Sequence, residues 1–181
     1  KKKIVKRTAP NREPNMNANK EKVVVVGAGL MGTGIAHAFA SAGFNTLLVD
    51  TNAVSLTNAR ASIEKILADG VRLGKVSEEQ AQQSLANLLT CSDLSEAAMG
   101  ANWLVETVSE QLAVKKAVIG QAAPLLAADA IIATNTSALS VTEIAASVDC
   151  ADRVIGMHFF NPVHKMKLVE LVRGLATSDE V

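Results

Sequence analysis

The chain has 181 residues, 49% of them hydrophobic, which is enough for one globular domain with a sizeable core. Its formal net charge is zero, but residues 1–14 carry +5 and residues 15–181 carry −5, so the body is acidic and nucleic-acid binding is not expected. No apolar stretch reaches the length of about 20 residues that spans a bilayer, so we expect no membrane segment. Cys91 and Cys150 have neither CxxC nor metal-ligand spacing, which favours a reducing, cytoplasmic compartment and no bound metal.

Residues 1–20 are rich in basic residues, Asn and Pro, and this composition predicts a disordered tail without a nucleic-acid or membrane role. Three origins fit the tail: a remnant left by protein expression ahead of a natural start at Met16, a linker from a preceding domain, or part of an organelle presequence. We favour the first, because a Met and a short polar lead-in directly precede the first strand. The folded domain is then expected over residues 21–181.

The first structured element is a short buried strand followed by a glycine-rich loop. Residues 23–26 are all Val, as in a strand that is buried on both faces of a parallel sheet. The motif Gly-Ala-Gly-Leu-Met-Gly follows, and then an Ala-rich helical stretch at residues 33–40. This order predicts a dinucleotide-binding loop at the N-terminus of a helix. Gly27 permits the tight turn, Gly29 lets the backbone approach a pyrophosphate, and Gly32 allows the helix to pack closely on the strand.

The second predicted strand, Asn45–Val49, is followed by Asp50, which lies 18 residues after Gly32. This is close to the spacing of about 20 expected for the acid that binds the adenosine ribose. A carboxylate here would accept from the 2′-hydroxyl and repel a 2′-phosphate, which favours NAD over NADP. The alternative is an ordinary turn aspartate after a strand.

Strands and helices alternate along the rest of the chain. Helical spacing is present at residues 53–68 and again after Ser77, which forms a capping-box pattern with Gln80. The further elements expected are strands at 88–91, 103–108 and 130–134, and helices at 93–99, 112–128 and 141–148, the last capped by Ser140. This alternation predicts a Rossmann-type α/β fold, a doubly wound and mostly parallel sheet whose ligands bind beyond the carboxyl ends of the strands.

Polar residues follow several of these strand ends. Asn135 and Ser137 come after the strand at 130–134, Glu110 and Lys115 come after the strand at 103–108, and Asn161 follows Phe160 in the same manner. Together they are expected to surround one edge of the sheet. Each has a simpler alternative, since Asn and Ser are common turn formers and Lys115 could only pair with Glu110.

Apolar, strand-like sequence runs from Arg153 to Glu170 on either side of a Pro-containing turn. If the two strands fold back with the turn at His164, the hairpin is antiparallel and His158 lies opposite Glu170, with Cβ atoms roughly 4.5 to 5.5 Å apart. A carboxylate at that reach fixes the imidazole tautomer and stabilises the protonated ring, which makes His158 a candidate general base near neutral pH. The alternative is a core hairpin in which the two side chains only satisfy each other. His37 and His164 are expected to be packing or surface residues.

Three motifs together carry a family resemblance. They are the glycine loop with its helix start at residues 27–36, Thr-Asn-Thr-Ser at residues 134–137, and His-Phe-Phe-Asn-Pro at residues 158–162 with Met166 and Leu-Val-Glu at residues 168–170. From about residue 22 to residue 172 the chain resembles the NAD-binding domain of L-3-hydroxyacyl-CoA dehydrogenases, including bacterial 3-hydroxybutyryl-CoA dehydrogenases. The resemblance implies that His158 is the catalytic base, Glu170 its partner, and Ser137 a contact of the substrate oxygen. The residues expected to bind the cofactor are Gly27, Gly29, Leu30, Met31, Gly32, Asp50, Glu110, Lys115, Asn135 and Asn161.

The resemblance implies an oxidoreductase that transfers hydride between NAD and an L-3-hydroxyacyl-CoA, with a short-chain substrate such as 3-hydroxybutyryl-CoA. Members of the family continue into an all-helical second domain, which supplies a further catalytic Asn, closes over the acyl-CoA and forms the homodimer contact. The 181 residues do not include such a domain, so the chain is expected to be a fragment, a chain cut during handling, or one that works with a separate partner. The alternative function is an NAD-binding module without turnover.

Overall fold

Strands and helices alternate along residues 21–181, which are the residues that the computed structural model describes. The predicted tail, residues 1–20, lies outside the described residues. The strands are β1 (Lys22–Val26), β2 (Asn45–Val49), β3 (Leu88–Cys91), β4 (Trp103–Glu106), β5 (Ile131–Thr134), β6 (Val154–Phe159) and β7 (Val169–Arg173). The α-helices are α1 (Leu30–Ser41), α2 (Ala53–Arg72), α3 (Glu78–Ala86), α4 (Leu94–Ala98), α5 (Leu112–Ala122) and α6 (Val141–Ala145), with 3₁₀ turns at Ala123–Leu125 and Ala151–Arg153.

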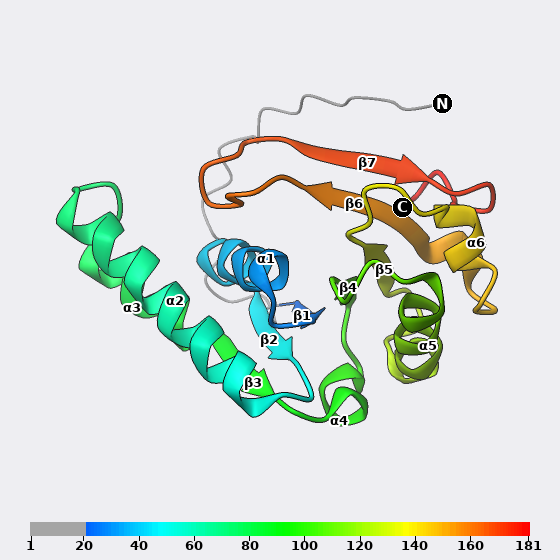
Figure 1. The fold of residues 1–181 in the computed structure, drawn as a ribbon, viewed down its shortest axis with the longest axis horizontal. Coiled ribbons are helices and arrows are strands. Elements are labelled where there is room, and N and C mark those ends of the chain that lie inside the picture. Colours follow the sequence, from blue (N-terminus) through cyan, green and yellow to red (C-terminus); the bar gives the residue numbers. More distant parts are fainter. Residues whose placement is uncertain (1–20) are drawn as a thin grey trace.

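The strands form one sheet in the order β3-β2-β1-β4-β5-β6-β7 (Figure 1). The strands β1 to β6 pair in parallel, and β7 pairs antiparallel with β6. The predicted Rossmann-type sheet with a C-terminal antiparallel hairpin is therefore confirmed. The chain moves outward from β1 to β3 and then returns to β4 on the other side of β1, so the strand order switches between β1 and β4. Ligands of such sheets bind in the crevice beyond the carboxyl ends of the strands at this switch point.

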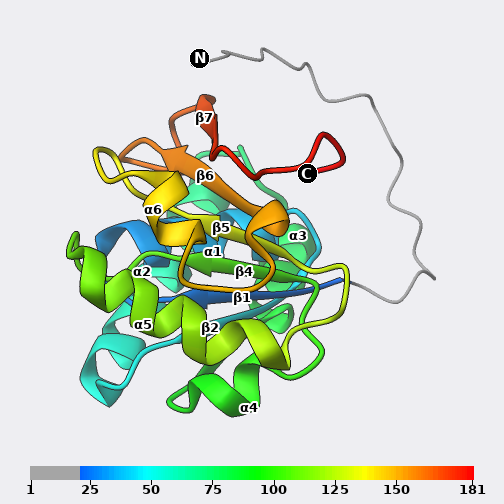
Figure 2. The ribbon, with the colours of Figure 1, turned by 90° about the vertical axis from the view of Figure 1, so that its right-hand side faces the viewer.

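Two layers of helices cover the sheet, with α1, α2 and α3 on one face and α4, α5 and α6 on the other (Figures 1 and 2). Successive side chains of a strand point to opposite faces. Val23 and Val25 of β1 therefore pack with α1 and α2, whereas Val24 and Val26 pack with α4 and α5. This is why β1 has only apolar residues after Lys22. Among the described residues, no helix combines the length and apolar character needed to cross a membrane.

Several elements are shorter than predicted, α5 and β4 among them. The helix predicted at residues 112–128 is wrong beyond Ala122, since α5 ends there and a 3₁₀ turn follows. Pro124 lacks the N–H group that would continue the α-helical ladder. The strand predicted to reach Val108 ends at Glu106, whose carboxylate accepts the N–H of Val108 at 2.7 Å and takes that N–H out of the ladder.

The predicted helix caps are present. Ser77 Oγ accepts the N–H of Gln80 at 3.1 Å, and Gln80 Oε1 accepts the N–H of Ser77 at 2.9 Å, which completes the capping box of α3. Ser140 caps α6 as predicted. This helix is nevertheless shorter than expected, because Ser147 donates both its N–H and its hydroxyl to the carbonyl of Ile144 and so closes a tighter turn.

Candidate active site

The glycine loop joins β1 to α1 at the switch point of the sheet. Gly27 has a φ angle of 105°, which favours glycine, and its N–H donates to the carbonyl of Val49 at 2.7 Å. A Cβ atom on Gly32 would lie 1.7 Å from the carbonyl oxygen of Gly27 and 2.5 Å from Oγ1 of Thr107. A Cβ atom on Gly29 would meet no atom within 4 Å. Close packing therefore requires glycine at positions 27 and 32, whereas the surface at Gly29 is open to a ligand.

The N-terminus of α1 starts at this open surface. The helix begins at Leu30, three residues before the predicted start, and Gly29 is its N-cap. Glycine has no side chain to accept hydrogen bonds from the first helical turn, whereas the side chains of Asn52 and Asp93 cap α2 and α4. N–H groups at a helix N-terminus attract phosphate, so the start of α1 fits the pyrophosphate of a dinucleotide. In the first turn Leu30 is exposed, and Met31 lines a neighbouring cavity.

Asp50 lies directly after β2 and lines, together with Gly27, a cavity of about 590 Å³. Its Oδ2 accepts the N–H of Ala28 at 2.8 Å, and its Oδ1 accepts the N–H of Asn52 at 2.9 Å. Asp50 therefore ties the glycine loop to the end of β2 and also presents its carboxylate at the cavity. A contact with Ala28, 22 residues away, is more than a local turn requires.

The hairpin places His158 opposite Glu170, as predicted. β6 and β7 pair in that register, and Nδ1 of His158 lies 3.1 Å from Oε2 of Glu170. The two side chains are 21% and 27% exposed, so their interaction is partly shielded from water. A carboxylate at Nδ1 accepts a hydrogen bond from the N–H of that nitrogen, which leaves the lone pair of Nε2 available to accept a proton.

A cavity of about 380 Å³ lies beside His158, at the carboxyl ends of β4, β5 and β6. Three strand ends and the first turn of α1 contribute to its wall. The lining residues are Met31, Thr107, Val108, Glu110, Asn135, Ser137, His158, Phe159, Phe160 and Asn161. The structure therefore brings together His158, Glu110, Asn135, Ser137 and Asn161, which come from three separate segments of the sequence, at the ends of β4, β5 and β6.

Asn135 has a structural contact that the sequence does not reveal. Its Oδ1 accepts the N–H of Phe159 at 2.9 Å. The parallel pairing of β5 with β6 ends at Thr134 and Gly156, so the Asn135 side chain continues the connection where the backbone ladder stops. It thereby holds β6 at the residue that follows His158.

Lys115 lines neither of these two cavities. Its side chain is fully buried, and Nζ lies 2.9 Å from Oε1 of Glu106 and 3.2 Å from Oε2 of Glu110. The expected pairing with Glu110 is present, but Glu106 is a second and closer partner that was not predicted from the sequence. A lone carboxylate at the end of the otherwise apolar stretch Trp103–Glu106 is the signal that could have identified it, because an acidic residue is almost never fully buried unless it is paired.

Glu110 is exposed and faces the cavity. Partial burial raises the pKa of this carboxyl, but hydrogen bonds from Thr136 and Lys115, the charge of Lys115 and the N–H of Ser137 outweigh that effect. The pKa of Glu110 is consequently lower than its ordinary value. The cavity wall therefore carries an ionised carboxylate at neutral pH.

The other two histidines lie away from this cavity's lining. The ring of His37, in α1, stands edge-on to the ring of His164, in the β6–β7 turn, with centroids 6.3 Å apart. Burial and the charge of His164 lower the pKa of His37. His164 is exposed and His37 is half-buried, which agrees with their expected roles as surface and packing residues.

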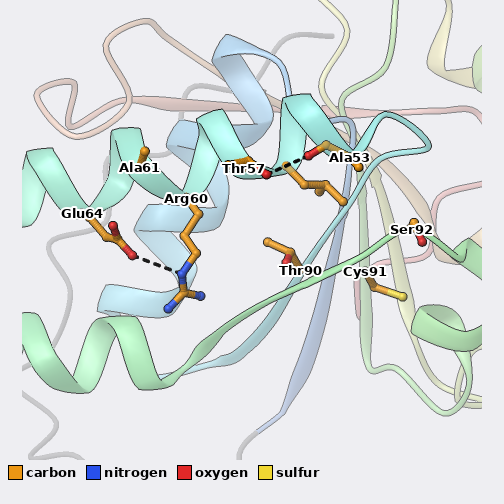
Figure 3. Close-up of a pocket in the computed structure, with 9 residues that line it drawn as sticks. Ala53, Thr57, Arg60, Ala61, Glu64, Thr90, Cys91 and Ser92 are labelled. Carbon is orange, nitrogen blue, oxygen red and sulfur yellow. Dashed lines mark hydrogen bonds and ion pairs between the residues drawn. The ribbon is translucent and has the colours of Figure 1, made fainter.

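A separate hollow of about 470 Å³ lies between α2 and β3 (Figure 3). In it Arg60 pairs with Glu64 at 3.1 Å and donates to the carbonyl of Leu88. None of the residues predicted for catalysis or cofactor binding lines this hollow. The predicted site residues instead gather at the carboxyl ends of the central strands and at the hairpin.

The fold and the site define a class of protein. The switch point of the sheet, the open glycine loop at the start of α1 and the carboxylate of Asp50 fit a dinucleotide such as NAD. The pair formed by His158 and Glu170 adds a group that can accept or donate a proton at the adjoining cavity. The chain is therefore a dinucleotide-binding domain.

The chain belongs to the family described as "3-hydroxyacyl-CoA dehydrogenase, NAD binding domain", which matches residues 22–181. It is 43% identical over 166 residues to the 3-hydroxyadipyl-CoA dehydrogenase of Escherichia coli (strain K12), a match that covers 92% of this chain and 35% of that protein. It is 41% identical over 159 residues to the 3-hydroxybutyryl-CoA dehydrogenase of Bradyrhizobium diazoefficiens, with 88% and 54% covered.

A crystal structure of 3-hydroxybutyryl-CoA dehydrogenase from Escherichia coli K12 matches the fold with a TM-score of 0.86 and 43% identity, over 91% of this chain and 34% of that one. The chain thus spans between about a third and about half of the length of these relatives. The family resemblance that the motifs indicated is confirmed. The cofactor of the family, NAD, is the one predicted.

Proposed function

We propose that the chain forms the cofactor-binding and proton-transfer part of an NAD-dependent L-3-hydroxyacyl-CoA dehydrogenase. The observation that carries the proposal is the 3.1 Å contact between Nδ1 of His158 and Oε2 of Glu170, beside a cavity at the carboxyl ends of the central strands. Membership of the family and the names of the relatives support the substrate class. The reaction oxidises the 3-hydroxyl group of the acyl chain to a 3-keto group.

Bound NAD supplies the hydride acceptor of this reaction through its nicotinamide ring. The glycine loop and the first turn of α1 hold the pyrophosphate, and Asp50 accepts a hydrogen bond from the adenosine ribose. The loop residues proposed for cofactor binding are Gly27, Gly29, Leu30, Met31 and Gly32, of which Gly29 has the open surface that the pyrophosphate needs. Glu110, Asn135 and Asn161 contribute to the nicotinamide end of the site. Lys115 contributes indirectly, through its ion pair with Glu110.

The chain's own side chains move the proton. Nε2 of His158 accepts the proton of the substrate 3-hydroxyl, and the carboxylate of Glu170 stabilises the imidazolium that forms. The hydroxyl of Ser137, at the same cavity, contacts the substrate oxygen and holds it toward His158. In the reverse direction, protonated His158 returns its proton to the oxygen of the 3-keto group. General acid–base catalysis of this kind contributes roughly 10²- to 10⁴-fold.

The finer assignment is a short-chain substrate, 3-hydroxybutyryl-CoA. One relative is named for a butyryl and one for an adipyl substrate, so a panel of acyl-CoA thioesters decides the chain length. The proposal also includes a homodimer, which sedimentation velocity would test. Cys91 and Cys150 carry free thiols, which supports a reducing compartment, here the cytoplasm.

The test uses the full-length gene product with NAD and 3-hydroxybutyryl-CoA, and it follows NADH absorbance. Glu170→Gln is expected to keep the calorimetric affinity for NAD and to lower kcat by roughly 10²- to 10⁴-fold, because the imidazolium loses its counter-charge. Glu79→Gln, an exposed carboxylate on α3, is the matched control and keeps kcat. Unchanged turnover in Glu170→Gln would remove Glu170 from the mechanism. NAD binding without turnover of the unaltered protein would favour the alternative, a module that binds the cofactor only.

A further inference from the structure

Glu106, the last residue of β4, is a fully buried carboxylate beneath the proposed active site. Four hydrogen bonds from three groups hold it. The Lys115 ammonium lies 2.9 and 3.2 Å from its two oxygens, the Thr134 hydroxyl lies 2.6 Å from Oε2, and the Val108 N–H lies 2.7 Å from Oε1. Burying a charge is costly even when it is paired, and apolar residues of similar volume often replace such pairs without loss of stability. Stability alone therefore explains this carboxylate poorly.

The Lys115 ammonium connects Glu106 to the surface of the cavity. Besides its bonds to Glu106, Nζ lies 3.2 Å from Oε2 of Glu110. Glu110 in turn accepts a hydrogen bond from the hydroxyl of Thr136 and another, at 3.2 Å, from the N–H of Ser137. An unbroken series of polar contacts thus runs from the buried end of β4, through α5, to the loop after β5 that carries Ser137.

The charge of Glu106 determines the position of the Lys115 ammonium. A lysine side chain has a flexible four-carbon stem and a charge without directional preference, so its position depends on the groups that surround it. The carboxylates of Glu106 and Glu110 both hold the ammonium, which also donates to the carbonyl of Val108 at 3.4 Å. If Glu106 becomes neutral, the ammonium loses its nearest charged partner, and the carboxylate of Glu110 no longer has a fixed partner.

We infer that Glu106 is a positioning residue for Ser137: it fixes the ammonium of Lys115, which fixes Glu110, which holds the N–H of Ser137 at the cavity. The inference rests on the proposed function, in which the Ser137 hydroxyl contacts the substrate oxygen. Glu106 itself touches neither substrate nor cofactor. Displacements of about 1 Å at a catalytic group can cost roughly a hundredfold in rate, so this indirect support matters for turnover.

The test compares Glu106→Gln in two backgrounds of the full-length protein, unaltered and Ser137→Ala. Gln has the same shape as Glu but no charge. In the unaltered background Glu106→Gln is expected to lower kcat roughly ten- to hundredfold. In the Ser137→Ala background the same substitution is expected to change kcat less than about twofold, because the hydroxyl that it would misplace is already absent. An equal loss in both backgrounds would overturn the inference.

Two further measurements separate positioning from a general loss of stability. Ile63→Val, a core change in α2 far from the series of contacts, lowers the melting temperature but leaves kcat unchanged. Thr136→Val removes one of the hydrogen bonds that hold Glu110, nearer the surface, and is expected to give the same background-dependent loss if Glu106→Gln does not fold. A drop in melting temperature without any change in kcat for Glu106→Gln or Thr136→Val would contradict the inference.

Amide hydrogen exchange gives a readout that does not need turnover. The N–H of Ser137 is bonded to Glu110 and is expected to exchange roughly tenfold faster in Glu106→Gln than in the unaltered protein or in Ile63→Val. Unchanged exchange at Ser137 would overturn the inference even if the protein is active. An unaltered protein without turnover, but with faster exchange in Glu106→Gln, would overturn the proposed function and leave the positioning role supported.

Discussion

Alanine at Gly32 and at Gly29 is expected to have different effects, because the two glycines have different surroundings. At Gly32 the new Cβ would lie 1.7 Å from the carbonyl oxygen of Gly27, whereas real Cβ contacts essentially never fall below 3.0 Å, so these atoms must separate by about 1.3 Å. The obstacle is backbone, which cannot rotate away. We therefore expect Gly32→Ala to lower the free energy of unfolding by about 3 kcal/mol or more, the upper end of the range for overpacking.

At Gly29 the new Cβ would meet nothing within 4 Å and the backbone already has an extended conformation, with φ at −77°. Gly29→Ala is therefore expected to lower the free energy of unfolding by no more than about 1 kcal/mol, because Ala is a poorer N-cap residue than Gly. Its methyl group would occupy the space assigned to the pyrophosphate. We expect the Kd for NAD to rise at least about tenfold, which corresponds to about 1.4 kcal/mol.

Urea unfolding and calorimetric titration with NAD measure the two effects independently. Gly120→Ala is the matched control, because a Cβ atom on Gly120, in α5, would also meet no atom within 4 Å. This control is expected to stabilise the fold by about 0.5 to 1 kcal/mol and to leave NAD binding unchanged. Gly29→Ala with unchanged NAD affinity, or Gly32→Ala with full stability, would refute the reasoning about the loop.

Three further predictions concern charged groups. Asp50→Ala is expected to weaken NAD binding and to relax discrimination against NADP, and competitive titration with both cofactors that shows neither change would contradict this role. Lys115→Met leaves the Glu106 carboxylate buried without its cation and is expected to lower the free energy of unfolding, measured in urea, by about 3 to 5 kcal/mol. The double variant Glu106→Gln/Lys115→Met should recover most of that loss. Burial and the charge of His164 lower the pKa of His37, so the unfolded chain takes up a proton at this residue more readily than the folded chain. The contribution of neutral His37 to the free energy of unfolding is therefore complete above about pH 6.5 and is lost as the pH falls below that value. His37→Gln should reduce this dependence of the melting temperature on pH.

The N-terminal unit and the hairpin could be predicted because their information is local in the sequence. The four valines before Gly27 show that β1 is buried on both faces, and the glycine spacing specifies the loop that follows. In the hairpin, the apolar strands on either side of one turn leave a single register that pairs His158 with Glu170.

The contacts that support the site depend on packing between distant elements and could not be predicted in the same way. Lys115 reaches Glu106 only because α5 lies against the end of β4. Asn135 reaches Phe159 only because β5 and β6 are neighbours in the sheet. Neither neighbourhood is encoded in residue spacing, so the sequence indicated Lys115 and Asn135 as cofactor ligands and did not show what they hold in place.

We propose above all that His158 transfers the proton in an NAD-dependent oxidation. The most direct measurement is the turnover of His158→Gln in the full-length protein with 3-hydroxybutyryl-CoA, combined with calorimetric titration of the same sample with NAD. We expect kcat to fall roughly 10²- to 10⁴-fold while the Kd for NAD stays within about twofold of the unaltered value. A His158→Gln protein that turns over at the unaltered rate would contradict it.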